Sequence, residues 1–310
     1  MNETTKRILS GVTIGGLACG ALYAEAFDWI LLFVLLFLFS QMGLYEFYHL
    51  TDRGLDGRPF RKLGAFFAGL IVLGYYAQFL AMKSAQGYEL DGFVATFVAW
   101  FYPNGNNLAP TLLFIFLICA SILQILTRPL DGTIYNLSVS VGGIIYTTLG
   151  VCHGMLLMGM PHGIFYLVLF AVLPVSTDTG AYFAGRWFGR HNAGLKVSPK
   201  KTYEGYAGGI VTAVVVGIGL LLGWQKWAPA ALADIPMHPV EMSVLAFFIA
   251  FVSIFGDLAE SALKRDAKIK DSASTIPGHG GMLDLADAIY FSLPIGYFYL
   301  TYKSMLGFGL

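Results

Sequence analysis

The chain has 310 residues, of which 56% are hydrophobic and 12% are charged. A soluble globular domain carries about twice that share of charge. Apolar runs near the ~20 residues that a helix needs to cross a bilayer recur along the chain, so the composition predicts an all-α polytopic membrane protein. It excludes a soluble enzyme, a disordered chain, a nucleic-acid-binding module and a disulfide scaffold. Lys+Arg equals Asp+Glu at 19 each, so the net charge of zero indicates no particular partner.

Nine apolar runs are long enough to be transmembrane helices. We expect the first to be retained rather than cleaved as a signal peptide, because no small-residue cleavage site follows it. A further stretch, Phe93–Tyr102, is too short to cross and predicts an interfacial or re-entrant piece. In chain order the predicted spans are Ile8–Ala24, Trp29–Tyr45, Gly64–Met82, Pro110–Leu126, Ile134–Leu157, Ile164–Gly185, Tyr206–Trp224, Val240–Phe255 and Ala288–Tyr302.

The basic residues predict the orientation of these spans. With the N-terminus in the cytoplasm, all of the 19 basic residues except Lys83, Lys226 and Lys303 fall on the cytoplasmic side, as the positive-inside rule requires. We therefore expect a cytoplasmic N-terminus, an external C-terminus and a bacterial cytoplasmic (inner) membrane. Residues 1–310 are expected to form a single membrane domain, with N-terminal helices in 1–157 and the polar cytoplasmic loops in 158–310.

The first region with unusual charges surrounds the sixth predicted span. Asp178 lies inside that span, where a carboxylate costs at least ~3 kcal/mol, so we expect it to face the bundle interior and meet a cation or metal. Helix packing through a pair with Arg186 is the alternative. Lys200 and Lys201 follow, with Glu204 and several glycines. Adjacent lysines beside a helix start suit either a phosphate site or contact with anionic lipid headgroups.

The second region, residues 256–287, combines a polar helix face with a glycine-rich turn. Helical spacing predicts one stripe formed by Asp257, Glu260, Ser261, Lys264 and Lys268. The sequence Pro277-Gly278-His279-Gly280-Gly281 cannot continue a helix, so the backbone turns there. Asp284 and Asp287 then follow at i, i+3, where a helix would place them on one face.

Carboxylates from two helix ends with basic residues between them suit a divalent cation that carries a polyphosphate. Mg²⁺ prefers oxygen ligands and is usually held by one or two carboxylates plus substrate phosphates. For His279 we favour phosphate contact over metal ligation, because no His or Cys partner stands at ligand spacing. A solvated amphipathic loop is the structural alternative. The chain has no GxxxxGK[ST], GxSxG or HExxH motif, which argues against a Walker-type phosphate loop, a serine hydrolase and a zinc protease.

The second region resembles the signature of the phosphatidate cytidylyltransferases, or CDP-diacylglycerol synthases. That signature runs Ser-x-hydrophobic-Lys-Arg, Lys-Asp, Pro-x-His-Gly-Gly and Asp-x-x-Asp. It is matched by Ser261, Lys264, Arg265, Lys270, Asp271, Pro277, His279, Gly280, Gly281, Asp284 and Asp287. The chain departs from it at Leu285, where the family usually has Arg or Cys, and at Ala288, where it often has Ser.

The resemblance implies transfer of a cytidylyl group from CTP to phosphatidate, giving CDP-diacylglycerol and pyrophosphate. Asp257 and Asp284 would then hold a catalytic Mg²⁺, and Asp287 and Asp178 would orient it or support a second cation. The catalytic basic residues would be Lys264 and Arg265. Further substrate contacts would come from Lys200, Lys201, Glu204, Ser261, His279, Gly280 and Gly281. Glycine-rich spans would also permit a homodimer.

Three other functions fit parts of the sequence. The same chemistry on another lipid phosphate, such as an archaeal ether lipid or a polyprenyl phosphate, uses identical polar residues. A transporter of an anionic solute would use Asp178 and Asp257 as coupling sites, but such sites lie near the bilayer midplane. A purely structural subunit would not explain the His-Gly-Gly turn.

Overall fold

The computed structural model describes residues 16, 20, 28–54, 57–269, 272–273 and 280–307. It divides into two compact units: unit 1 is Met1–Met160 with Ala267–Leu285, and unit 2 is Pro161–Asp266 with Ala286–Leu310. The described residues form helices and loops without a β-strand, apart from one isolated bridge between Asn192 and Thr202. Seven of these helical segments are long and apolar enough to cross a membrane. The prediction of an all-helical polytopic membrane protein is therefore confirmed.

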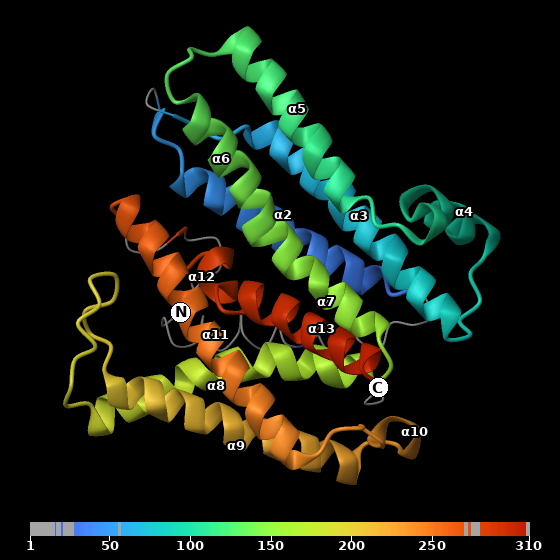
Figure 1. The fold of residues 1–310 in the computed structure, drawn as a ribbon, viewed down its shortest axis with the longest axis vertical. Coiled ribbons are helices and arrows are strands. Elements are labelled where there is room, and N and C mark those ends of the chain that lie inside the picture. The colour runs from blue at the N-terminus through green and yellow to red at the C-terminus, as the bar shows by residue number, and fades with distance from the viewer. Residues whose placement is uncertain are drawn as a thin grey trace. The chain divides into compact units, whose positions relative to one another are not determined.

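Unit 1 is organised around helix α3, whose buried face carries Phe67, Ile71, Phe79 and Leu80. This helix packs against α2, α4, α5 and α7 (Figure 1). The helices of this unit are α2 (Ile30–Leu50), α3 (Arg61–Ala85), α4 (Gly92–Phe101), α5 (Ala109–Thr127), α6 (Thr133–Gly143), α7 (Gly150–Gly159) and α12 (Met282–Ala286). A π-helical turn, η4 (Ile144–Leu149), joins α6 to α7, so that Thr133–Gly159 forms one span.

Unit 2 is built on helix α8 (Gly163–Phe188), which packs against α9 (Tyr203–Trp227), α11 (Pro239–Asp266) and α13 (Ile289–Met305). A single turn of helix, α10 (Ala230–Ala233), connects α9 to α11. Thr202 begins α9 by accepting a hydrogen bond from the backbone N–H of Gly205 at 3.1 Å. Such caps satisfy donors that the first helical turn leaves unpaired.

Seven of the nine predicted spans correspond to the seven apolar segments of the structure. The predicted first span, Ile8–Ala24, lies almost entirely outside the described residues. The predicted last span corresponds to α13, a 17-residue helix, and the short stretch Phe93–Tyr102 corresponds to the ten-residue α4. The count of nine and the orientation stay predictions.

Two details of the predicted polar helix faces are wrong. Helix α11 ends at Asp266, and Lys268 has a positive φ of 59°, so Lys268 does not belong to the stripe that begins at Asp257. Asp284 and Asp287 do not share one helix either. Asp284 lies in α12, which ends at Ala286, and Asp287 lies before the start of α13. Periodicity alone does not reveal such an interruption, because both segments remain locally helical.

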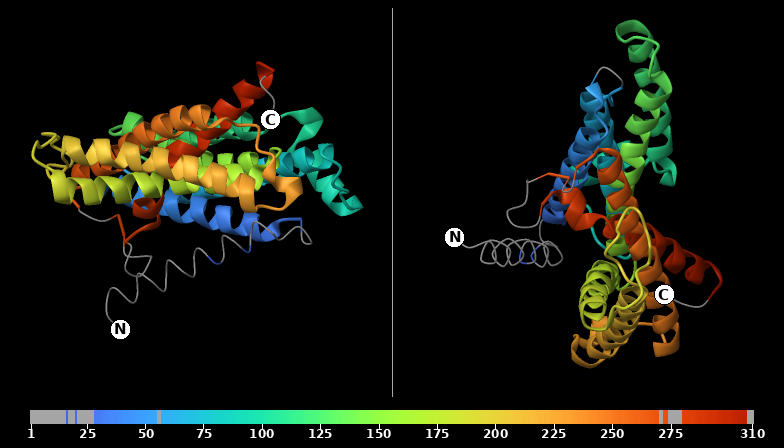
Figure 2. Two further views of the ribbon diagram at one scale, coloured as in Figure 1. Left: turned by 90° about the horizontal axis from the view of Figure 1, so that it is seen from below. Right: turned by 90° about the vertical axis from the view of Figure 1, so that its left-hand side faces the viewer.

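Small residues bring α8 and α9 into close contact along their length (Figure 2). A Cβ atom built on Gly208 of α9 would lie 2.1 Å from the Cβ of Ala184, and one on Gly180 of α8 would lie 2.3 Å from the hydroxyl oxygen of Thr212. Small residues permit this backbone approach, which is the usual basis of tight helix packing in membranes. The two helices together carry the loop that closes one side of the candidate site.

Replacing Gly208 tests this packing. We expect Gly208→Val to force α8 and α9 apart, at a cost of about 1–3 kcal/mol, the usual range for overpacking. The midpoint of thermal unfolding in detergent should fall by several degrees. Gly219→Val is the matched control on the same helix, because a Cβ at Gly219 meets nothing within 4 Å. Equal midpoints for the two variants would contradict the assignment.

Candidate active site

A cavity of about 530 Å³ opens in unit 2 between α8, the start of α9 and α11. This volume suits a small-molecule ligand, since such sites usually measure about 300–1,000 Å³. Its walls carry two carboxylates and three basic groups, together with two tyrosines. The charged and aromatic residues are Asp178, Tyr182, Arg186, Lys200, Lys201, Tyr206 and Asp257.

An ion pair between Lys201 and Asp257 lies at the centre of this cavity. Lys201 comes from the loop before α9 and Asp257 from α11, and their side chains are only 29% and 21% exposed. Burial lowers the pKa of Lys201, while the negative charges of Asp178 and Asp287 act in the opposite direction. The ammonium group therefore lies within the field of three carboxylates. Its ring contact with Tyr206, at 5.7 Å, adds a cation–π interaction.

Asp287 adds a further carboxylate to this group. Burial, followed by the negative charge of Asp178, raises the pKa of Asp287 to about 7. One of its carboxylate oxygens accepts a hydrogen bond from the backbone N–H of Ala288 at 2.6 Å. The backbone here lies against Gly256, where an added Cβ would be 2.9 Å from the carbonyl oxygen of Asp287. A side chain larger than glycine at position 256 would therefore displace the segment that carries Asp287.

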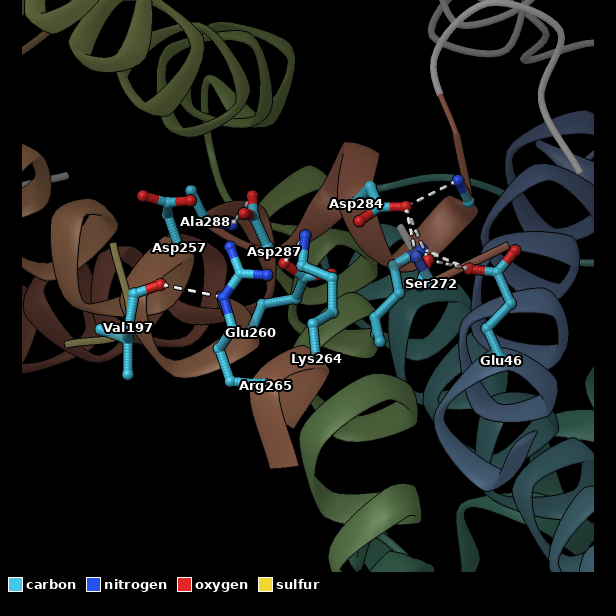
Figure 3. Close-up of polar contacts among 12 residues, drawn as sticks. Glu46, Val197, Asp257, Glu260, Lys264, Arg265, Ser272, Asp284, Asp287 and Ala288 are labelled. Atoms are coloured by element: carbon cyan, nitrogen blue, oxygen red, sulfur yellow. Dashed lines mark hydrogen bonds and ion pairs between the residues drawn. The ribbon is translucent and has the colours of Figure 1, made fainter. Parts of the chain in front are cut away.

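The loop from 189 to 202 is held in place at several points. The carboxylate of Glu204 accepts hydrogen bonds from the backbone N–H groups of Arg190 and His191, and it pairs with the His191 ring at 2.5 Å. The Arg265 guanidinium donates to the carbonyl oxygen of Val197 at 3.4 Å (Figure 3). These contacts place Glu204 and Arg265 as supports of the lysine loop. Neither residue lines the cavity.

A second buried ion pair lies on α11, one turn beyond Asp257. Glu260 is fully buried and pairs with Lys264 across one helical turn. The neighbouring Ser261 does not line the cavity. Lys264 nevertheless acts on the site, since its positive charge influences both Lys201 and Asp287.

Asp284, in unit 1, has a different environment. Its Oδ2 atom accepts hydrogen bonds from the backbone N–H of Ser272 at 3.0 Å, from the Ser272 hydroxyl at 2.8 Å and from the backbone N–H of Gly281 at 2.8 Å (Figure 3). Gly280, with a positive φ of 91°, precedes this contact, and only glycine adopts that conformation without strain. Asp284 therefore fixes the end of the glycine-rich turn. His279 lies outside the described residues.

Glu46 is the polar residue of this region that the sequence did not single out. It lies near the end of α2, is 1% exposed, and accepts hydrogen bonds from the backbone of Met282 and Leu283 and from the Ser272 hydroxyl. A carboxylate inside an otherwise apolar helix is the signal that would have found it. The predicted span ended at Tyr45, one residue before it, and so left it unexamined.

The departures from the family signature also have defined places. Ala288 is buried, and its Cα would lie 3.1 Å from a Cβ built on Gly256. Leu285 is half-buried in α12, and its backbone N–H bonds to the carbonyl oxygen of Gly281. The alternative reading of Asp178 as a partner of Arg186 gains no support, because the Arg186 guanidinium donates instead to the hydroxyl of Tyr182 at 3.2 Å.

The donor atoms of the cavity fit a hard cation that also binds a ligand. Among the described residues, no group of three or more His, Cys, Asp and Glu side chains is arranged to hold a metal by itself. Asp257 and Asp287 nevertheless supply buried carboxylate oxygens beside Lys201. Mg²⁺ commonly binds through one or two carboxylates and completes its shell with phosphate oxygens and water. The set therefore fits a cation delivered with a polyphosphate.

Cationic side chains, carboxylates and a ligand-sized cavity in a helical membrane protein define an integral membrane protein with a site suited to phosphorylated ligands. The sequence profile described as the cytidylyltransferase family matches residues 5–303. The chain therefore belongs to the cytidylyltransferase family, as its signature residues indicated.

Individual relatives agree with this family. Over 140 residues the chain is 39% identical to the phosphatidate cytidylyltransferase of Bacillus subtilis, covering 45% of this chain and 49% of that protein. It is 37% identical over 139 residues to the phosphatidate cytidylyltransferase of Haemophilus influenzae, covering 44% and 46%. It is also 34% identical over 186 residues to the uncharacterized protein YnbB of Escherichia coli, covering 58% of each chain. The matches thus span about half the length of these relatives.

Removing Lys201 tests the electrostatic design of the cavity. We expect Lys201→Met to lower stability by about 1–2 kcal/mol, because it leaves Asp257 and its neighbouring carboxylates without their nearest cation; the figure is reduced from the buried-pair value for partial exposure. Millimolar Mg²⁺ should restore part of the loss in thermal midpoint. Lys200→Met, which removes an exposed lysine from the same loop, is the control. A Lys201→Met protein as stable as the control, and insensitive to Mg²⁺, would contradict the prediction.

Proposed function

We propose that the protein transfers the cytidylyl group of CTP to phosphatidate, producing CDP-diacylglycerol and pyrophosphate. The observation that carries this proposal is the cavity in which Lys201 and Asp257 pair beside Asp178 and Asp287. Family membership and the names of the relatives support the choice of CTP and phosphatidate.

The residues of the cavity have separate tasks in this reaction. The basic groups Arg186, Lys200 and Lys201 bind phosphate oxygens of the nucleotide or of the lipid headgroup. Asp257 and Asp287 are the residues that would hold Mg²⁺, which when bound neutralises phosphate charge and stabilises the leaving pyrophosphate. A phosphate oxygen of phosphatidate attacks the α-phosphorus of CTP, and the bond to the pyrophosphate oxygen breaks. The attacking oxygen is already anionic, so no general base is needed and positioning carries most of the catalysis.

Other residues named from the sequence have supporting roles in the proposal. Lys264 adds positive charge near Asp287, and Glu204 and Arg265 hold the lysine loop. The predicted roles of Ser261 and His279 in substrate contact, and of Asp284 in metal binding, stay predictions. So does the homodimer.

The first experiment measures pyrophosphate release by the purified protein in detergent with phosphatidate, CTP and Mg²⁺. We expect release only when all three are present, with EDTA and ATP in place of CTP as negative controls. Release with an ether-linked or polyprenyl phosphate but not with phosphatidate would move the assignment to another lipid. Absence of both release and CTP binding would reject cytidylyl transfer and favour an anion transporter.

A pair of variants on one helix locates the chemistry. Asp257→Asn keeps the shape of the side chain but weakens cation binding, so we expect at least a 100-fold loss of kcat with the protein still folded. Asp266→Asn, at the exposed end of the same helix, should keep activity within about twofold. Activity of Asp257→Asn within a few-fold of the unmodified protein would remove Asp257 from the mechanism.

We further propose nine spans, with the N-terminus and the cavity on the cytoplasmic side of a bacterial inner membrane. The distribution of basic residues supports this orientation. In a background without other cysteines, Lys196→Cys should react with a membrane-impermeant maleimide only in inside-out vesicles, and Asp234→Cys only in right-side-out vesicles. These two exposed positions lie in the loops at opposite ends of α9. The reverse labelling would contradict the orientation.

A further inference from the structure

Glu46 is a buried carboxylate in an apolar helix. It lies five residues from the C-terminus of α2, is 1% exposed, and its neighbours Leu44 and Phe47 are buried apolar side chains. A carboxylate removed from water costs several kcal/mol unless hydrogen-bond donors replace the lost water. Its retention in unit 1 therefore depends on the groups it contacts.

Those groups all come from a segment more than 220 residues later in the chain. The Oε1 atom accepts from the backbone N–H of Met282 at 2.9 Å, and Oε2 accepts from the backbone N–H of Leu283 at 2.8 Å and from the Ser272 hydroxyl at 3.1 Å. Met282 and Leu283 are the first residues of α12, where N–H groups lack partners within the helix. Glu46 thus caps α12 from a distant part of the sequence.

The same contacts connect Glu46 to Asp284. The Ser272 hydroxyl lies between the two carboxylates, 2.8 Å from Asp284 and 3.1 Å from Glu46 (Figure 3). A serine hydroxyl has one proton, so it donates fully to only one of them at a time. Gly281 allows this approach, because a Cβ there would lie 2.0 Å from the Ser272 hydroxyl oxygen and 2.3 Å from a Glu46 oxygen.

We propose that Glu46 is a positioning residue, which fixes the residues from Gly281 to Asp284 by capping α12 and thereby sets the start of the Asp-x-x-Asp sequence. Glu46 contacts backbone and a hydroxyl rather than the cavity, so it acts through the segment that it holds. The inference rests on the proposed function only in its effect on turnover, because the effect on the segment itself is measurable without substrate.

The first test measures amide hydrogen exchange in the full-length protein in detergent, without CTP or lipid. Glu46→Gln retains the size of the side chain but replaces one accepting oxygen by an amide that cannot accept. We expect exchange in the peptide containing Met282 and Leu283 to accelerate at least tenfold, with α3 and α5 unchanged. Ser40→Ala is the matched control on α2, since it removes a different buried hydrogen bond, to Thr148, and should change exchange at Met282 and Leu283 less than twofold.

The second test separates positioning from general stability. For Glu46→Gln we expect kcat to fall at least tenfold, the KM for CTP to stay within threefold, and the thermal midpoint to stay close to that of Ser40→Ala. Ser272→Ala should lower kcat in the same way. The double variant should lose no more than the more impaired single variant, because both changes release the same segment.

Unchanged exchange at Met282 and Leu283 in Glu46→Gln would overturn the proposal. So would equal acceleration throughout α2 and α3, because it would show a loss of fold rather than of position. If Glu46→Gln does not fold, Ser272→Ala must show the local acceleration, and its absence there rejects the inference. An unmodified protein that releases no pyrophosphate would refute the proposed function, while the exchange measurement would still decide the role of Glu46.

Discussion

A charged group inside a membrane protein needs a partner that replaces water, and the two polar centres described here both satisfy this requirement. In unit 2, the Asp257 carboxylate is paired with the Lys201 ammonium inside a cavity. In unit 1, the Glu46 carboxylate is surrounded by backbone N–H groups and a hydroxyl. The low polarity of the surroundings makes each partner costly to lose. The positions of loops and short helices follow from this pairing.

The two kinds of partner have different chemical consequences. An ion pair such as Lys201 with Asp257 can open when a ligand supplies both an anion for the lysine and a cation for the carboxylate. A phosphate accompanied by Mg²⁺ supplies both, so the cavity exchanges an internal pair for two pairs with its substrate. Backbone N–H groups, in contrast, cannot leave without unwinding the helix they begin. The Glu46 contacts therefore suit a permanent support, and the Lys201 pair suits a binding site.

Most of the transmembrane architecture could be predicted from hydropathy, because a helix in lipid satisfies its own backbone hydrogen bonds and its length is set by the bilayer. The predicted boundaries failed where polar residues extend a helix beyond its apolar run. Helix α11 continues to Asp266, eleven residues past the predicted Phe255, because its polar face is buried through the Glu260–Lys264 pair. Conversely, the expected common face of Asp284 and Asp287 is lost at the break after Ala286. Periodicity does not register such a break.

The sequence by itself determined the membrane class, the positions of seven long helices and the family, since these depend on local hydropathy and on the spacing of signature residues. It also selected Asp178, Lys201, Asp257 and Asp287 individually. Only the tertiary structure decided which of them meet, because an ion pair or a cap joins residues from different helices. Glu46 shows this most clearly: its partners lie more than 220 residues away. No local pattern determines that contact, because it forms only when the helices pack.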